Sequence, residues 1–256
     1  MQGDLLKHAQ VGSSVPESFS SEFNVPDEAR ILLRSTNGSV RVVPSRSGRL
    51  EVEVRVAGHV SVAGTKRLTT SLRPSDPYMI LDTEYEDTGI RASADYVIGL
   101  PPKEGVGLTA ELLNGSLSAE SLPCGLDVSL GNGDLTASGL TGELRARLVN
   151  GSVEVTGSPR VSFVRAGGRV DMEIGGIPSG GASVTSLSGE VRVRLAAGLK
   201  LQLAVRAGSG EVSVEDLSPK NVVTAGGSLR GDLNGGGPRL GLTSVSSGVF
   251  LGSAGG

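Results

Sequence analysis

Residues 112–157 read LLNGSLSAESLPCGLDVSLGNGDLTASGLTGELRARLVNGSVEVTG and contain the dipeptide Asn-Gly three times. The asparagines are Asn114, Asn132 and Asn150, so the dipeptide recurs at steps of 18 residues. A polar and then an aliphatic residue follows each pair, as in Ser116-Leu117. Asn and Gly adopt positive φ at low cost, which tight turns need. The even spacing therefore predicts one type of turn repeated along the chain.

The same signature recurs in degenerate form over most of the chain. Weaker turns lie between the signatures, as at Gly125, Gly142 and Pro159, so each period holds two strands and two turns. The further copies are NGSVRV at 37–42, GGRVDM at 167–172, SGEVRV at 188–193, SGEVSV at 209–214, GGSLRG at 226–231 and SGVFLG at 247–252.

Apolar and polar residues alternate between these turns, as in residues 50–56, 170–174 and 199–206. A period of two is typical of strands that bury one face and expose the other. The only helix candidate is the short stretch GDLLKHAQ at 3–10. We therefore predict an all-β protein.

Two architectures fit repeated strands and turns: an antiparallel meander or a coil. Asn-Gly suits each single hairpin of a meander, but a meander does not explain why only alternate turns carry it. In a coil, like turns stack, and Asn114, Asn132 and Asn150 can form an amide ladder. We therefore predict a single-domain β-solenoid (β-helix) of short strands, two or three per rung, with an aliphatic core.

The solenoid is expected to span residues 23–251. Residues 1–22 are Ser-rich and are predicted to form a flexible N-terminal arm or cap, and 252–256 a frayed tail. Residues 60–105 lack the Asn-Gly mark; we interpret them as longer excursions of the same stack, with a sub-boundary near 101–105 at Pro101-Pro102.

Composition limits the function classes. Aromatic residues make up 3% of the chain, Trp is absent, and the formal charge is −3 with both signs interspersed. Nothing in this balance favours nucleic acid or an anionic membrane. No window approaches 18 apolar residues and the start lacks a signal-peptide pattern, so we expect no membrane insertion. The expected location is cytoplasmic as given, or the cell surface if a leader was removed.

Nucleophilic catalysis needs a histidine beside a serine or cysteine. His8 and His59 have no local partner pattern, so we interpret both as exposed loop residues. Cys124, the only cysteine, lies between Pro123 and Gly125; a reactive thiol is the alternative to a small, half-buried turn residue. No disulfide can form within one chain, and we predict no catalytic residue.

Metal sites are also unsupported. One cysteine and two distant histidines do not make a zinc site. Gly131, Gly133 and Asp134 match the calcium β-roll pattern once, without recurrence, so we interpret them as a structural turn. We expect no metal and no cofactor.

The densest acidic cluster contains Asp82, Glu84, Glu86 and Asp87 around Tyr85. Paired carboxylates can hydrolyse glycosides, but we interpret the cluster as a solvated strand end and loop. Asn37, Asn114 and Asn150 match glycosylation sequons, which the turn composition already explains. Glycan binding lacks aromatic support, because Trp is absent and there are three Tyr.

Two stretches carry a resemblance to a known family. SFSSEFNVPDEARILLRSTNGSVRVVPS at 18–45 is followed by RLEVEVRV, and VIGLPPKEGVGLTAELLNGSLSAESL at 97–122 precedes further Asn-Gly rungs. This order resembles a bacterial family of β-solenoid proteins named "putative adhesin", a domain of unknown function. The resemblance covers residues 23 to 251 and implies a β-helical fold; the family has no catalytic residues to transfer.

The predicted function is a non-enzymatic scaffold or interaction module that binds a protein partner or associates with itself through its end rungs. One alternative is a surface adhesin that binds glycan or protein. Another is a polysaccharide-active β-helix enzyme using Asp82 to Asp87.

Overall fold

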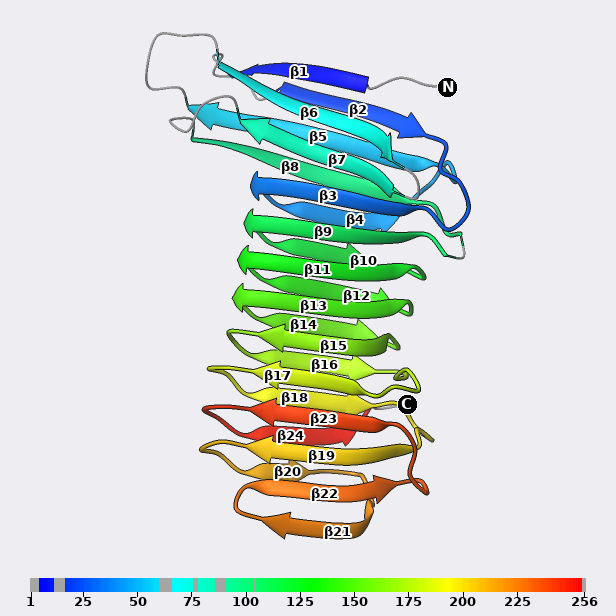
Figure 1. The fold of residues 1–256 in the computed structure, drawn as a ribbon, viewed down its shortest axis with the longest axis vertical. Coiled ribbons are helices and arrows are strands. Elements are labelled where there is room, and N and C mark those ends of the chain that lie inside the picture. Colours follow the sequence, from blue (N-terminus) through cyan, green and yellow to red (C-terminus); the bar gives the residue numbers. More distant parts are fainter. Residues whose placement is uncertain are drawn as a thin grey trace. The chain divides into compact units, whose positions relative to one another are not determined.

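The computed structural model describes residues 5–11, 17–59, 66–75, 78–85, 91–103 and 105–254 (Figure 1). Side chains are described at residue 18 and from 20 to 254, except at 57–78, 82–92 and 104. The chain forms two compact units, Met1–Asn132 and Gly133–Gly256. None of the described residues belongs to a helix, so the all-β prediction is confirmed.

The first unit contains two mixed sheets. In the β3 sheet the strand order is β1-β6-β7-β3-β9-β11, and in the β4 sheet it is β2-β5-β8-β4-β10. The strands are β1 (Leu5–Val11), β2 (Glu17–Phe23), β3 (Arg30–Asn37), β4 (Val40–Pro44), β5 (Leu50–His59), β6 (Lys66–Ser75), β7 (Tyr78–Tyr85), β8 (Arg91–Leu100), β9 (Gly107–Asn114), β10 (Leu117–Glu120) and β11 (Gly125–Asn132).

Strands that carry the Asn-Gly turn pair in parallel. β3 pairs with β9, and β9 pairs with β11, so Asn37, Asn114 and Asn132 lie in one register row. The predicted amide ladder is present in this unit: Asn132 Nδ2 donates to Asn114 Oδ1 at 2.8 Å, and Asn114 Nδ2 donates to Asn37 Oδ1 at 3.0 Å. The prediction that like turns stack is therefore confirmed here.

Residues 50–100 interrupt this parallel series with antiparallel strands. β5 pairs with β8 and with β2, while β6 pairs with β7 and β1, all antiparallel. Part of the predicted excursion at 60–105 is thus an antiparallel extension of both sheets. The helix candidate at 3–10 was wrong, because residues 5–11 form strand β1 against β6.

The second unit also contains two sheets. The β13 sheet has the order β13-β15-β17-β23-β19-β22-β21, and the β12 sheet has the order β12-β14-β16-β18-β24-β20. The strands are β12 (Leu135–Leu140), β13 (Glu143–Asn150), β14 (Val153–Gly157), β15 (Arg160–Ala166), β16 (Val170–Ile174), β17 (Ala182–Ser186), β18 (Val191–Leu195), β19 (Leu201–Ala207), β20 (Val212–Val214), β21 (Lys220–Ala225), β22 (Ser228–Leu233), β23 (Arg239–Ser244) and β24 (Val249–Ser253).

The last two strands do not lie at the end of the stack. β23 pairs in parallel with both β17 and β19, and β24 pairs in parallel with both β18 and β20. Figure 1 shows this pair in red between the yellow strands. The signature at 247–252 therefore lies between those at 188–193 and 209–214. The predicted rung at 226–231 was wrong, since β22 is antiparallel to β19 and β21.

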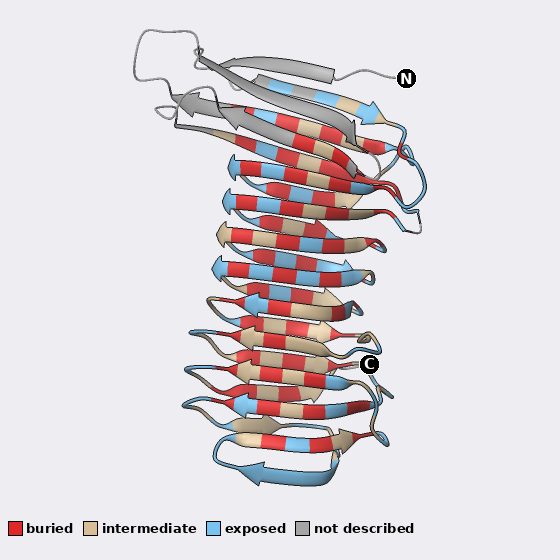
Figure 2. Cartoon of the chain, viewed as in Figure 1, coloured by how far each residue is buried: buried red, intermediate tan, exposed pale blue. Residues whose placement is uncertain are grey.

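Aliphatic side chains fill most inward positions of these sheets, and Figure 2 shows the resulting alternation of buried and more exposed residues along most of the strands whose side chains are described. Strand β21 is an exception, because all of its residues are exposed. In the β12 sheet the register stacks Val170, Val191 and Val249 above one another, each fully buried. The predicted alternation at 50–56 and 170–174 is confirmed in the same way. In the predicted stretch 199–206 the alternation holds from Leu201 onward, whereas Leu199 precedes β19 and is only partly buried.

The predicted boundaries of the domain stay predictions. The structure places strand β1 and all but the last residue of β2 within residues 1–22, and it divides the chain after Asn132 rather than near 101–105. The end of the predicted tail, residues 255 and 256, lies outside the described residues.

Candidate functional site

The outward side of the β13 sheet carries rows of side chains that cross its strands. Strand register places Arg147, Arg165, Thr185, Thr243 and Arg206 in one row, from β13 through β15, β17 and β23 to β19. Strands lie about 4.8 Å apart, so neighbours in a row can act on one ligand. Side chains alternate between the two faces of a strand, and the residues that precede Arg165 and Arg206, namely Val164 and Val205, are buried. The row therefore lies on the outward face of the sheet.

The next row is formed mainly of small residues. Register aligns Phe163, Ser183, Gly241 and Ala204 on β15, β17, β23 and β19, followed by Arg230 on β22. Gly241 has no side chain and Ala204 has only a methyl group, so the larger side chains around them project further from the sheet. The result is an open groove of about 630 Å³ on the outward side of the sheet.

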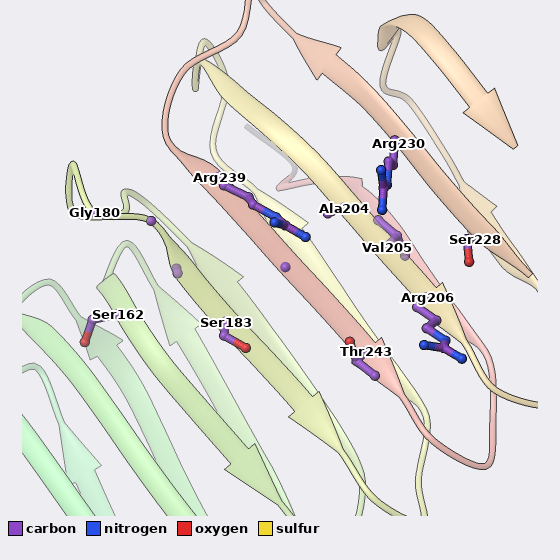
Figure 3. A pocket seen from close by; sticks show the side chains of 13 residues that line it. Ser162, Gly180, Ser183, Ala204, Val205, Arg206, Ser228, Arg230, Arg239 and Thr243 are labelled. Atoms are coloured by element: carbon purple, nitrogen blue, oxygen red, sulfur yellow. The ribbon is translucent and has the colours of Figure 1, made fainter.

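Three arginines surround this groove. Figure 3 shows Arg206, Arg230 and Arg239 on three strands around Ala204. All three are exposed, and among the described residues none of them forms an ion pair with an acidic side chain. Ser183, Ser228 and Thr243 line the same groove, so its polar groups are guanidinium donors and hydroxyls. We call Arg147, Arg165, Arg206, Arg230 and Arg239 the basic face.

The β12 sheet of the same unit distributes charge differently. Arg169 and Arg194 contact Asp171 at 2.7 and 2.9 Å, and Arg192 contacts Glu190 at 2.9 Å. The Arg192 guanidinium also lies 5.4 Å from the centre of the Phe250 ring. Arginines on this sheet are thus neutralised within the protein, whereas those around the groove remain available to an external anion.

An aliphatic row borders the basic face. Val149, Leu187 and Val245 follow Arg147, Thr185 and Thr243 by two positions in the chain. Their exposed fractions are 61%, 37% and 53%. Gly167 and Gly208 take the other places in this row; a Cβ at Gly208 would lie 1.7 Å from the Val245 carbonyl oxygen. Glycine is therefore required there by close packing, and the row adds apolar area beside the arginines.

Several residues considered from the sequence lie outside the described residues. The side chains of His8, His59, Asp82, Glu84 and Tyr85 are not described, although their backbones lie in strands, and Glu86 and Asp87 are not described at all. The interpretation of the acidic cluster as a solvated strand end and loop therefore stays a prediction.

The surroundings of Cys124 and Asp134 indicate structural roles for both residues. Cys124 is 5% exposed, so it is fully buried rather than half-buried, and that burial raises the pKa of its thiol. A raised pKa lowers the thiolate fraction and hence reactivity. Asp134 Oδ1 accepts a hydrogen bond from the Ser152 amide at 2.7 Å, which links two successive turns of the second unit.

Other site classes find no support in the described part of the chain. It contains no group of three or more His, Cys, Asp or Glu side chains arranged to hold a metal. It also contains no helix long and apolar enough to cross a membrane.

The basic face was missed because its residues are far apart in sequence. Arg206 and Thr243 become neighbours only when β23 inserts beside β19. A partial signal was available, because Glu143–Asn150 and Arg160–Ala166 each carry two arginines at outward positions. It does not extend to Gly125–Asn132 or Ala182–Ser186, which contain no arginine.

No protein-family profile and no curated protein matches the chain. It is similar to a solved "putative cell adhesion protein" of Clostridium sporogenes, at 12% identity and a TM-score of 0.44, over 94% of this chain and 100% of that one. It is similar to a "putative adhesin" of Bacteroides fragilis, at 12% identity and a TM-score of 0.47, over 92% and 97% of the two chains. A "putative adhesin" of Parabacteroides merdae follows, at 11% identity and 0.36, over 93% and 97%. TM-scores below 0.5 carry no functional argument, so the resemblance seen in the sequence stays a resemblance.

Proposed function

We propose that this protein is a non-enzymatic interaction scaffold: a β-solenoid that holds an acidic partner in the groove of its second unit. Support for the solenoid is the parallel pairing of alternate strands, as β14 with β16 and β16 with β18. From β12 to β20 successive strands enter different sheets, which fits a coil with two strands per rung. Such a body is rigid, because each inner rung satisfies the backbone groups of its neighbours.

The observation that carries the binding role is the set of unpaired arginines over a floor of small residues. The chain has a net charge of −3, yet Arg206, Arg230 and Arg239 gather around one groove without acidic partners among the described residues. Neutralising pairs are common elsewhere, as in Arg34 with Glu111 at 2.9 Å. Guanidinium groups left free on a rigid sheet suit carboxylate, sulfate or phosphate.

Binding of the full chain to polyanions at low ionic strength tests this function. We expect poly-glutamate or polygalacturonate to bind the wild type by titration calorimetry, and binding to weaken as salt rises. Substituting Arg206→Gln with Arg239→Gln removes two groove cations. The matched control, Arg30→Gln with Arg49→Gln, changes two exposed arginines of the first unit. Equal binding by the two double variants would refute the groove as the contact surface.

Self-association through an end strand is a second candidate, favoured by β21. Each of its six residues is exposed, and Val222 and Val223 are 44% and 64% exposed at the sheet edge. Exposed edges of this kind can template another strand. Asn221 has a φ of 53°, and the register of β21 against β22 shifts between Lys220 and Val223, so the continuous register covers Val223, Thr224 and Ala225.

Sedimentation velocity over a range of concentrations tests this second candidate. We expect the wild type to show a concentration-dependent dimer and Val223→Asp to remain monomeric. Val149→Asp, which removes a similarly exposed valine away from the edge, is the control. Monomer alone in the wild type at high concentration would rule out the end-strand contact.

The surface-adhesin alternative uses the same groove and adds export of the protein. Fractionation of the native host cells distinguishes the two, because a scaffold is expected in the cytosol and an adhesin at the surface.

A further inference from the structure

The chemistry of the groove narrows its ligand class. We infer that the groove binds an acidic polysaccharide, a chain of sugars that carry carboxylate or sulfate groups, lying across the strands. This inference rests on the proposed function and specifies its partner.

The direction of the groove disfavours a peptide. Its floor residues Ser183, Gly241 and Ala204 belong to three neighbouring strands in one register row, so the groove crosses the sheet rather than following a strand. Strand β23 in its middle is bonded on both sides, to β17 and to β19. A peptide would find no free backbone groups there for its own N–H and C=O, which it obtains at sheet edges.

Sugar hydroxyls and acidic groups fit the polar groups that are present. Thr243, Ser183 and Ser228 line the groove with hydroxyls that both donate and accept hydrogen bonds. Arg206 and Arg230 offer guanidinium forks, which bind a carboxylate or sulfate through two parallel hydrogen bonds. Arg206 and Arg230 lie on the paired strands β19 and β22, and their positions in the register differ by two residues. One anionic sugar can therefore reach both guanidinium groups.

Aromatic chemistry separates this ligand from nucleic acid and neutral glycans. Single-stranded nucleic acid binds by stacking bases on aromatic side chains. Phe163 is the aromatic residue in the floor row, and the Arg147 guanidinium lies 5.6 Å from the centre of its ring. That ring is therefore partly covered, and none of the described residues that line the groove is aromatic.

Strand spacing sets the length of ligand that the groove can hold. The groove floor and Arg230 lie on four neighbouring strands, β17, β23, β19 and β22. The distance across these strands, from β17 to β22, is about 14 Å. Affinity is expected to rise with oligosaccharide length up to this span and to level off beyond it. A simple ion-exchange surface would show no such plateau.

The decisive experiment compares four polymers on the full chain by titration calorimetry: oligogalacturonates of increasing length, poly-glutamate of matched charge, a single-stranded oligonucleotide and neutral dextran. We expect oligogalacturonate to bind about tenfold more tightly than poly-glutamate or the oligonucleotide, with no binding of dextran. Equal or tighter binding of poly-glutamate or the oligonucleotide overturns the glycan inference and leaves the proposed function standing. No binding of any polyanion overturns both.

A floor substitution separates shape from charge. Ala204→Leu leaves every charge in place but fills the middle of the groove, so oligogalacturonate affinity is expected to fall about tenfold. Ser129→Leu, an outward position on β11 of the first unit, is the matched control and should bind as the wild type does. Unchanged binding by Ala204→Leu overturns the placement of the sugar chain in this groove. Thermal unfolding of both variants shows whether the fold is intact.

Discussion

At the scale of single residues, a missing Cβ decides how closely the Asn-Gly turns approach. Gly115 has a φ of 151°, and its amide donates to the Asn132 carbonyl at 2.8 Å. A Cβ built on Gly115 would lie 1.8 Å from the Gly38 carbonyl oxygen. The turn therefore needs glycine because of the stacked neighbour as well as the backbone angle.

Replacing Gly115 by alanine is expected to lower the free energy of unfolding by about 2–4 kcal/mol, because the turns must separate. Urea unfolding monitored by circular dichroism measures the loss. Gly176→Ala is the control: the nearest atom to its added Cβ is 3.9 Å away, and we expect a change below about 0.5 kcal/mol. Equal effects of the two substitutions would contradict this account of the stacked turns.

Glu51 gives a second prediction at this scale. Its Oε1 accepts hydrogen bonds from the Ser47 amide and hydroxyl, the Ser45 hydroxyl and the Arg46 amide. These bonds, led by the Ser47 amide, lower the pKa of Glu51 below its model-compound value of 4.5. A carboxyl with a lowered pKa in the folded state stabilises the protein above the unfolded pKa, and that contribution is lost as the pH falls through the folded pKa.

Glu51→Gln should therefore destabilise the protein at pH 7 and have a smaller effect at pH 3. Urea unfolding of both proteins at the two pH values measures the difference. Glu215→Gln, at an exposed site, serves as the control. A Glu51→Gln effect that is equal at both pH values would contradict a role for the carboxylate charge.

At the scale of elements, the main feature is the insertion of β23 and β24. Register pairs Thr185 of β17 with Thr243 of β23, and Thr243 with Arg206 of β19. An arrangement in sequence order would instead place β17 directly beside β19. The insertion places Thr243 beside Thr185 and Gly241 beside Ser183, so Gly241 becomes part of the groove floor.

Disulfide trapping tests this arrangement. Neighbouring parallel strands lie about 4.8 Å apart, within the Cα separation that a disulfide can bridge, whereas a separation of two strands exceeds it. We expect Thr185→Cys with Thr243→Cys to form a disulfide on mild oxidation. Thr185→Cys with Arg206→Cys should stay reduced. Mass spectrometry of the digested protein identifies the cross-link, and the reverse result would indicate sequence-order stacking.

At the scale of the whole molecule, charge is unevenly distributed over the described surface. Most described arginines of the first unit pair with acids, as Arg41 does with Glu120 at 3.0 Å, and those of the β12 sheet of the second unit do likewise. Groove arginines lack such partners among the described residues. A weakly acidic chain can therefore still attract a polyanion to one face, because local charge rather than net charge governs contact at physiological ionic strength.

Ligand binding to the folded state should raise the thermal stability of the whole protein. Oligogalacturonate at 100 times its Kd would add about 2.7 kcal/mol, which corresponds to a Tm increase of about 5 °C or more. Scanning calorimetry measures the shift. Arg206→Gln with Arg239→Gln should abolish it, whereas Arg30→Gln with Arg49→Gln should retain it. A shift that persists in the groove variant would place the binding site elsewhere.

The sequence by itself determined the strands, the turns and the aliphatic core. Alternation at 170–174 specifies which side chains are buried, and the Asn-Gly spacing specifies which turns stack. Both are local patterns, because side-chain direction and positive φ depend on near neighbours in the chain.

Only the tertiary structure decided the order of the strands, and with it the groove. Val170, Val191, Val212 and Val249 begin nearly equivalent strands, so local pattern would allow each to pair with any other. Likewise, Asn37 pairs with Asn114 across 77 residues, with the antiparallel strands β5 to β8 lying between them in sequence. Similar strands present the same hydrogen-bonding edge and the same aliphatic row, so the choice among them depends on the whole packed chain. The basic face exists only once that choice has been made.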